Sequence, residues 1–192
     1  MITIKSKEEI ELMRKAGYLV SLTHQYLKPL IKPGITTKEL DLRAEKFIKE
    51  HDGIPTCKGY EGFPATLCVS VNDEVVHGIP GKRKLRNGDI VTIDMVIGYH
   101  GYQGDAAWTY AVGDISEDKK YLMEHTEKAL YEGIKQVKPG NHIGDISHAI
   151  EVYATKYNLG VVKELVGHGI GTEMHEDPDV PNYGKAGTGP KL

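Results

Sequence analysis

The sequence predicts an α+β domain in which one structural unit occurs twice. Two segments with helical spacing flank Lys32-Pro33-Gly34, and two more flank Lys138-Pro139-Gly140, 106 residues later. A run of β-branched residues lies between the two pairs of helices. Chance is the alternative explanation, because Pro-Gly commonly separates helices. We expect a single domain over 1–192, with pseudo-repeats at approximately 1–115 and 116–192 related by a pseudo-twofold axis.

The helices are predicted from caps and periodicity. The first begins at the capping box Ser6-Lys7-Glu8-Glu9 and ends at Pro29, and the second begins at the similar box Thr36-Thr37-Lys38-Glu39. A third is expected from near Ser116 to about Val137, and a fourth from Ile143 to Tyr157. At the offset of 106, three pairs of positions coincide on the face expected to be buried: Leu40 with Ile146, Ala44 with Ile150, and Phe47 with Tyr153.

The composition indicates an ordinary globular protein. Of its 192 residues, 40% are hydrophobic and 27% charged, and the net charge of −3 gives no reason to expect nucleic acid or an anionic membrane as a partner. No apolar run is long enough to span a bilayer, and the N-terminus lacks the apolar core of a secretion signal. We therefore expect a cytoplasmic protein with Cys57 and Cys68 as free thiols.

Two aspartates form the most informative pair in the sequence. Asp94 lies within the strongest strand prediction, Ile90–Ile97, and Asp105 follows the glycine-containing turn 98–101. If the hairpin is centred between Tyr99 and His100, the two carboxylates are directly opposed on one face and repel each other. A bound cation or a shared proton would relieve that repulsion. A shifted register that sends one Asp to solvent is the third interpretation.

Three histidines lie in segments rich in glycine. His168 sits in Gly167-His168-Gly169-Ile170-Gly171, His175 follows seven residues later, and His77 precedes a Gly/Pro turn. Flanking glycines leave an imidazole room to reach a metal, although each histidine alone is also typical of an ordinary loop. The sequence contains no H-E-x-x-H helix, nucleophile elbow, phosphate-binding loop or dinucleotide fingerprint.

Together these segments resemble the type I methionine aminopeptidases. The resemblance rests on 72–80, the pair Asp94 and Asp105, 167–171 and 175–178, in that order along the chain. It implies the duplicated pita-bread (creatinase/aminopeptidase) fold, a curved antiparallel sheet covered by helices. It also implies removal of the N-terminal methionine of nascent proteins, with a small second residue preferred, by two divalent ions of Co, Mn, Fe or Zn.

The resemblance assigns roles by position. Asp94, Asp105 and His168 would bind the metals, and His77 and His175 would contact the substrate during catalysis. The methionine pocket would be lined by Cys57, Tyr60, Phe63, Cys68 and Met174 together with the two catalytic histidines, and Asn72 would lie at a monovalent-cation site. Action on nascent chains would suit a place near the ribosome, which no residue indicates, and the full-length form is expected to be a monomer.

The family uses two further glutamate ligands, for which this chain has no equivalents before Leu192. The offset of 106 places counterparts of Asp94 and Asp105 at 200 and 211. We therefore expect that the last strands are missing, that the 192-residue chain has little or no peptidase activity, and that it aggregates, forms oligomers or has low stability. The competing readings are a non-catalytic pita-bread module that binds peptides or proteins, and an Xaa-Pro peptidase.

Overall fold

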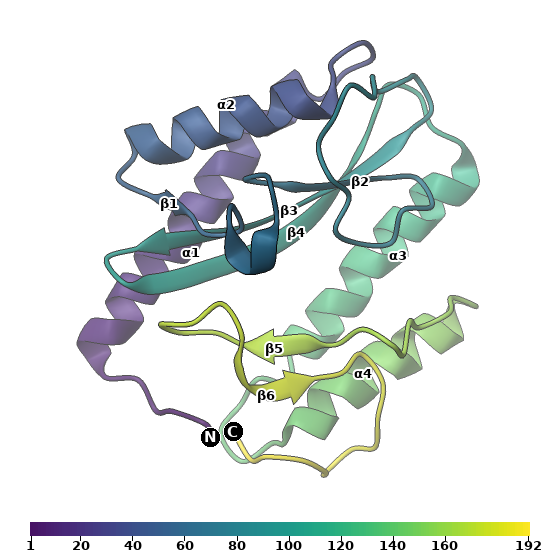
Figure 1. Ribbon diagram of the computed structural model, residues 1–192. Coiled ribbons are helices and arrows are strands. Elements are labelled where there is room, and N and C mark those ends of the chain that lie inside the picture. The colour runs from purple at the N-terminus through teal and green to yellow at the C-terminus, as the bar shows by residue number, and fades with distance from the viewer. The chain divides into compact units, whose positions relative to one another are not determined.

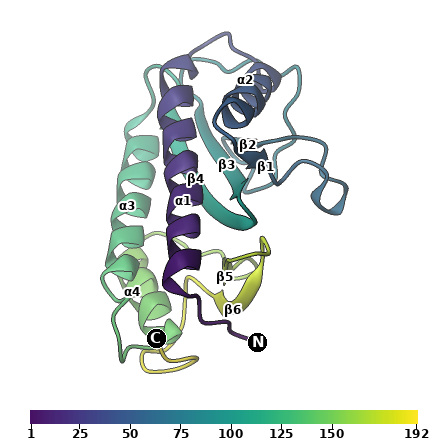
Figure 2. The ribbon, with the colours of Figure 1, turned by 90° about the vertical axis from the view of Figure 1, so that its left-hand side faces the viewer.

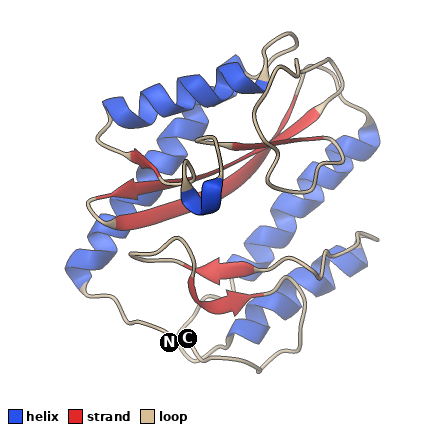
Figure 3. Cartoon of the chain, in the orientation of Figure 1, coloured by secondary structure: helices blue, strands red, loops and turns tan.

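The computed structural model describes residues 1–192, which divide into two compact units. The sheet unit comprises Ile4–Ser116 and Ile170–Met174. The helix-pair unit comprises Met1–Thr3, Glu117–Gly169 and His175–Leu192. Each unit contains both helices and strands, as the cartoon in Figure 3 shows. None of the helices combines the length and the apolar character that a bilayer span requires.

The sheet unit begins with two helices whose predicted caps are confirmed. Helix α1 spans Lys7–Leu27, and Ser6 and Glu9 form its capping box; a 3-10 turn, Lys28–Leu30, follows it at Pro29. Helix α2 spans Thr37–Glu50, with the capping box formed by Thr36 and Glu39. In each box the hydroxyl and the carboxylate satisfy two backbone N–H groups that the first turn leaves without helical partners.

Four antiparallel strands form the sheet of this unit: β1 (Ile54–Pro55), β2 (Cys68–Val71), β3 (Ile90–Tyr99) and β4 (Tyr102–Ala111). Strand β4 pairs with β3 along its whole length, so β1 and β2 share the opposite edge of β3 (Figure 1). A 3-10 turn, Tyr60–Gly62, lies between β1 and β2. The strand predicted at 90–97 is thus the centre of the sheet.

The main core lies between this sheet and α1 and α2, which cover one of its faces (Figures 1 and 2). The odd-numbered residues of β3 from 91 to 97 are fully buried in this core. Successive side chains of a strand point to opposite faces, so the even-numbered residues Thr92, Asp94 and Val96 face away from the helices. This second face carries the candidate functional residues of the sheet unit.

The helix-pair unit contains α3 (Glu117–Ile134) and α4 (Ile143–Lys156), which pack against each other. Their contact is tight at Gly133, where a Cβ atom would lie 2.8 Å from the side chain of Ile150. Strand β5 (Gly167–Gly169) pairs antiparallel with β6 (Glu176–Val180). The ammonium group of Met1 pairs with the carboxylate of Asp177 in β6, so the first residues of the chain belong to this unit.

The two units share a pattern of backbone hydrogen bonds. Helix α4 has the length of α2 and lies 106 residues later at both ends. Around α2, the sheet unit contains Gly34 N–H to Leu85 O, Leu85 N–H to Ile35 O, and Thr37 N–H to Arg83 O. Around α4, the helix-pair unit contains Gly140 N–H to Leu192 O, Leu192 N–H to Asn141 O, and Ile143 N–H to Pro190 O. The residues next to the helices are offset by 106 between the two units, and their hydrogen-bond partners, 83 and 85 against 190 and 192, are offset by 107.

Candidate active site

The hairpin that carries Asp94 and Asp105 has a different register from the predicted one. Asp94 pairs with Ala107 and Asp105 with Val96, so the expected direct opposition of the two aspartates is wrong. The turn is His100-Gly101, with φ values of 48° and 87°, and a two-residue hairpin loop of this kind requires positive φ at both positions.

The shift amounts to two residues, and an even shift keeps both carboxylates on one face of the sheet. Asp94 is half-buried and Asp105 is exposed. Residues in this diagonal relation have Cα atoms about 7–8 Å apart, with somewhat shorter Cβ separations. The face that turns away from α1 and α2 therefore presents two neighbouring acidic groups.

Both cysteines lie beside these carboxylates. Cys68 in β2 is directly opposite Asp94, and the Sγ of Cys57 accepts a hydrogen bond from the Val96 N–H at 3.3 Å. Burial raises the pKa of Cys57 to about 11 and that of Cys68 to about 12, and the charges of Asp94 and Asp105 contribute in the same direction. The two cysteines are free thiols, as predicted, and are protonated at neutral pH.

An apolar cluster borders the carboxylate pair on the same face. Cys57, Val96 and Met174 are buried together, and Phe63 packs against them. Three of these four residues are predicted pocket residues, drawn from well-separated parts of the sequence. Val96 was missed, although its position two residues after Asp94 in a strand is a sufficient signal for its place on this face. Tyr60 lies in the 3-10 turn beside this cluster and is 36% exposed.

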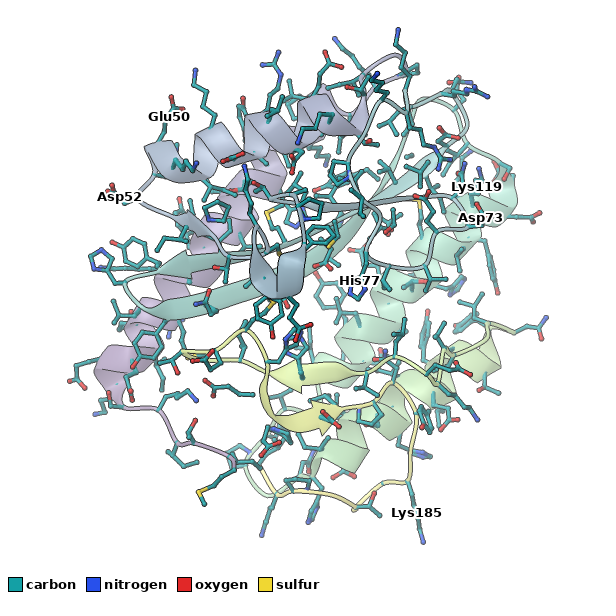
Figure 4. All side chains as sticks on the ribbon, viewed as in Figure 1. Glu50, Asp52, Asp73, His77, Lys119 and Lys185 are labelled. Atoms are coloured by element: carbon teal, nitrogen blue, oxygen red, sulfur yellow. The ribbon has the colours of Figure 1, made fainter.

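Asn72 and His77 occupy the loop between β2 and β3. Asn72 has a φ of 59°, donates from Nδ2 to Asp89 at 2.8 Å and accepts the Ile90 N–H at 3.1 Å. His77 is exposed, also has a positive φ of 58°, and is labelled in Figure 4. The next residue, Gly78, accepts the Val69 N–H at 2.8 Å, so the loop returns alongside β2 immediately after His77.

His168 and His175 lie together in the helix-pair unit. Their ring centroids are 4.3 Å apart in an edge-to-face arrangement. His168 Nδ1 lies 2.8 Å from the carbonyl oxygen of Gly169, which can only accept. Nδ1 therefore carries the proton and Nε2 the lone pair, which is the tautomer in which a histidine binds a metal through Nε2.

The donor chemistry suits divalent transition metals. Carboxylate and imidazole ligands together bind Mn, Fe, Co and Zn ions. Asp94 and Asp105 lie in the sheet unit, and His168 lies in the helix-pair unit. In neither unit do three or more His, Cys, Asp or Glu side chains gather into a complete metal site. The residues present thus fit a metal ion in type, as part of a ligand set.

Comparison with known proteins agrees with this chemistry. Residues 11–192 match metallopeptidase family M24. The chain is 54% identical to methionine aminopeptidase 1 of Bacillus subtilis and 52% identical to the methionine aminopeptidase of Clostridium acetobutylicum. Each alignment includes the whole of this chain and 77% of the relative.

Solved structures give the same result. The crystal structure of methionine aminopeptidase from Rickettsia prowazekii superposes with a TM-score of 0.98 at 42% identity, over 100% of this chain and 77% of that one. Prolidase from Pyrococcus furiosus shares the fold, with a TM-score of 0.81 at 22% identity over 95% of this chain. The predicted α+β pita-bread fold is confirmed. The chain belongs to metallopeptidase family M24 and, within it, to the type I-like methionine aminopeptidases.

Proposed function

We propose that this protein removes the N-terminal methionine from newly made polypeptides, with a preference for a small second residue. The observation that carries the proposal is the pair of carboxylates, Asp94 and Asp105, on the sheet face that also bears the apolar cluster of Cys57, Phe63, Val96 and Met174. Apolar side chains beside carboxylates that can bind metal are the combination that a methionine side chain and a scissile peptide bond require together.

Asp94, Asp105 and His168 would hold two divalent ions, of Co, Mn, Fe or Zn. When bound, such ions lower the pKa of water to near neutrality and polarise the carbonyl of the scissile bond. The chain's own part is to fix the ligands: β3 and β4 hold the two carboxylates on one face, and Gly169 O holds the His168 ring in its tautomer. The raised pKa values of Cys57 and Cys68 keep both thiols neutral beside the acidic pair.

The remaining site residues would contact the substrate. His77 and His175 would hold the amine and the scissile amide and stabilise the transition state. Cys57, Tyr60, Phe63, Cys68 and Met174 would surround the methionine side chain. Asn72, which already contacts Asp89 and the backbone of Ile90, would contribute to a monovalent-cation site. An enzyme with this substrate acts on nascent chains in the cytoplasm, near the ribosome, and its full-length form would be monomeric.

We also propose that the chain consists of two pseudo-repeats, approximately 1–115 and 116–192. The matched hydrogen bonds around α2 and α4 support this reading, because they recur at an offset of 106–107 although the side chains differ. The 192 residues supply three candidate metal ligands where the family uses five. We therefore expect that this polypeptide alone releases methionine slowly or not at all.

Titration of the purified 192-residue chain with Co²⁺ or Mn²⁺ in a calorimeter tests the metal site. We expect binding that weakens about tenfold or more in Asp94→Asn and in Asp105→Asn, since each removes a charged ligand. Asp118→Asn, in the first turn of α3, is the matched control and should bind like the parent chain. Metal affinity that is unaffected by both ligand substitutions contradicts the proposal.

Prolonged incubation of the Co²⁺-loaded chain with two peptides tests the substrate. We expect slow release of methionine from Met-Ala-Ser, no cleavage of an Xaa-Pro peptide, and no release by Asp94→Asn. Preferential cleavage of the Xaa-Pro peptide would assign the site to the other peptidase class. Rapid turnover of Met-Ala-Ser would contradict the expectation of low activity for this polypeptide.

A further inference from the structure

The side chain of Gln103 connects three segments that are far apart in the sequence. Gln103 lies in β4, directly opposite Gly98 in β3. Its Oε1 accepts a hydrogen bond from Thr56 Oγ1 at 2.8 Å, and its Nε2 donates to the carbonyl of Thr172 at 3.3 Å. Its backbone N–H also donates to the carbonyl of Gly171 at 2.8 Å. All these residues belong to the sheet unit.

Gly98 provides the space for this arrangement. A Cβ atom at Gly98 would lie 3.1 Å from both Gln103 Oε1 and Thr56 Oγ1, closer than ordinary van der Waals contact. The absence of a side chain at the cross-strand position therefore lets the carboxamide of Gln103 reach across β3 to Thr56. The φ of Gly98 is not positive, so this glycine is needed for space and not for a turn.

The two segments that are hydrogen-bonded to the side chain of Gln103 both continue into the apolar cluster. Thr56 directly precedes Cys57, and Thr172 comes two residues before Met174. Cys57 and Met174 are buried against Val96. The carbonyl of Val96 accepts a hydrogen bond from the Thr56 N–H, and the Val96 N–H donates to the Sγ of Cys57. Loop 170–174 has no strand pairing of its own, and Gln103 donates two hydrogen bonds to it, from its backbone N–H and from its Nε2.

We propose that Gln103 is a positioning residue that sets the Met174 wall of the methionine pocket. The identity of the pocket's ligand rests on the function proposed above, whereas the attachment of loop 170–174 by Gln103 does not. Glutamine is suited to this role because its carboxamide donates on one side and accepts on the other. Glutamate keeps the acceptor for Thr56 and loses the donor for Thr172, and methionine of similar length loses both.

Hydrogen exchange followed by mass spectrometry tests the attachment in the full 192-residue chain. We expect exchange in a peptide covering 170–174 to be about tenfold faster in both Gln103→Met and Gln103→Glu, since both lose the hydrogen bond to Thr172 and a lost hydrogen bond lowers local stability. Exchange in β3 and the melting temperature should change little. Gln25→Glu is the matched control, because Gln25 is exposed on α1 and its Nε2 donates to Ser21 within the same helix. Unchanged exchange at 170–174 in Gln103→Met would overturn the proposal.

Binding of L-methionine to the Co²⁺-loaded chain tests the positioning role. Gln103→Met should weaken L-methionine binding several-fold while Co²⁺ affinity remains that of the parent chain, a pattern that general loss of structure does not produce. Thr56→Val should weaken it in the same direction. If loop exchange rises but L-methionine affinity is unchanged, the loop attachment is right and the role in the pocket is wrong. If the parent chain does not bind L-methionine at all, the proposed function fails, and the exchange result still decides the attachment.

Discussion

The imidazole rings of His168 and His175 meet edge to face, with their centroids 4.3 Å apart. The two residues are seven positions apart and flank the loop 170–174, yet both belong to the helix-pair unit while the loop belongs to the sheet unit. The Nδ1 of His168 lies 2.8 Å from the carbonyl oxygen of Gly169. In the proposed function the neighbouring rings differ in role, His168 as a metal ligand and His175 as a substrate contact.

Substitution separates these two roles. His168→Ala removes a ligand and should weaken Co²⁺ binding about tenfold or more, whereas His175→Ala should leave it within about threefold. His148→Ala serves as a control from the same unit, since His148 is exposed and contacts the carbonyl of Gly184. Co²⁺ affinity measured by calorimetry checks the prediction. Equal losses from His168→Ala and His175→Ala would show that both rings act on the metal in the same way.

His24 should make the stability of the protein fall in mild acid. This side chain of α1 is 8% exposed, its Nε2 lies 3.2 Å from the Ala106 carbonyl, and its Nδ1 lies 3.0 Å from the Tyr110 hydroxyl. Ala106 O can only accept, so Nε2 carries the proton and Nδ1 accepts from Tyr110. Burial lowers the pKa of His24 from 6.5, and the bond to Ala106 O partly opposes this shift.

Below about pH 6.5 the unfolded chain takes up a proton at His24 that the folded chain still excludes, because the folded pKa is the lower one. The free energy of unfolding therefore decreases as pH falls below 6.5, by at most about 1.4 kcal/mol per pH unit from this residue. His24→Gln keeps a donor for Ala106 O and cannot be protonated. Urea denaturation at several pH values should show a flatter profile for this variant, and an unchanged slope would contradict the assignment.

Gly17 and Gly104 should respond to alanine in opposite ways although they lie against each other. A Cβ atom at Gly104 in β4 would lie 2.5 Å from the backbone nitrogen of Gly17, whereas one at Gly17 would meet nothing within 4 Å. Gly104→Ala forces α1 away from the sheet and should destabilise by about 1–3 kcal/mol or more. Gly17→Ala improves helix propensity and should stabilise by about 0.5–1 kcal/mol. Chemical denaturation measures both, and destabilisation by Gly17→Ala would contradict the packing described.

Local chemistry predicted the elements better than the pairing between them. Both N-terminal helices begin at the capping boxes found in the sequence, because a capping box is formed by residues only three positions apart. The aspartate hairpin was predicted two residues out of register because Gly98 and Gly101 were treated as equivalent turn residues. Only Gly101 adopts a positive φ, while Gly98 makes room for the contact between Gln103 and Thr56. The prediction that Asp94 and Asp105 share one face was still correct, because a register shift of two residues leaves each side chain on the same face of the sheet.

The residues that make long-range hydrogen bonds could not be identified from the sequence. Gln103, His24 and Asp41 act through contacts with residues 25 to 86 positions away, and no local pattern identifies the partner. Asp41 is the clearest case. It is 1% exposed within α2, and its Oδ1 accepts the backbone N–H groups of Thr66 and Leu67, at 2.8 and 3.0 Å, immediately before Cys68 begins β2.

Substitutions at Asp41 should distinguish the loss of an acceptor from the loss of a charge. Asp41→Ala leaves two buried N–H groups without a partner and should destabilise by about 2–5 kcal/mol. Asp41→Asn keeps the oxygen that accepts both backbone bonds. It replaces Oδ2, which accepts from the half-exposed Lys38, by an amide NH2 group, so the hydrogen-bonded ion pair with Lys38 is lost and a loss of about 1 kcal/mol is expected.

Thr66→Val is the informative comparison in the same segment. The Thr66 hydroxyl is buried without a hydrogen-bond partner, so replacing it by a methyl group of similar shape removes an unsatisfied polar atom. This variant should be as stable as the parent chain or slightly more stable. Urea denaturation of the three variants checks the order Thr66→Val, Asp41→Asn, Asp41→Ala from most to least stable. Equal stability of Asp41→Asn and Asp41→Ala would mean that the charge, and not the two backbone bonds, anchors the start of β2.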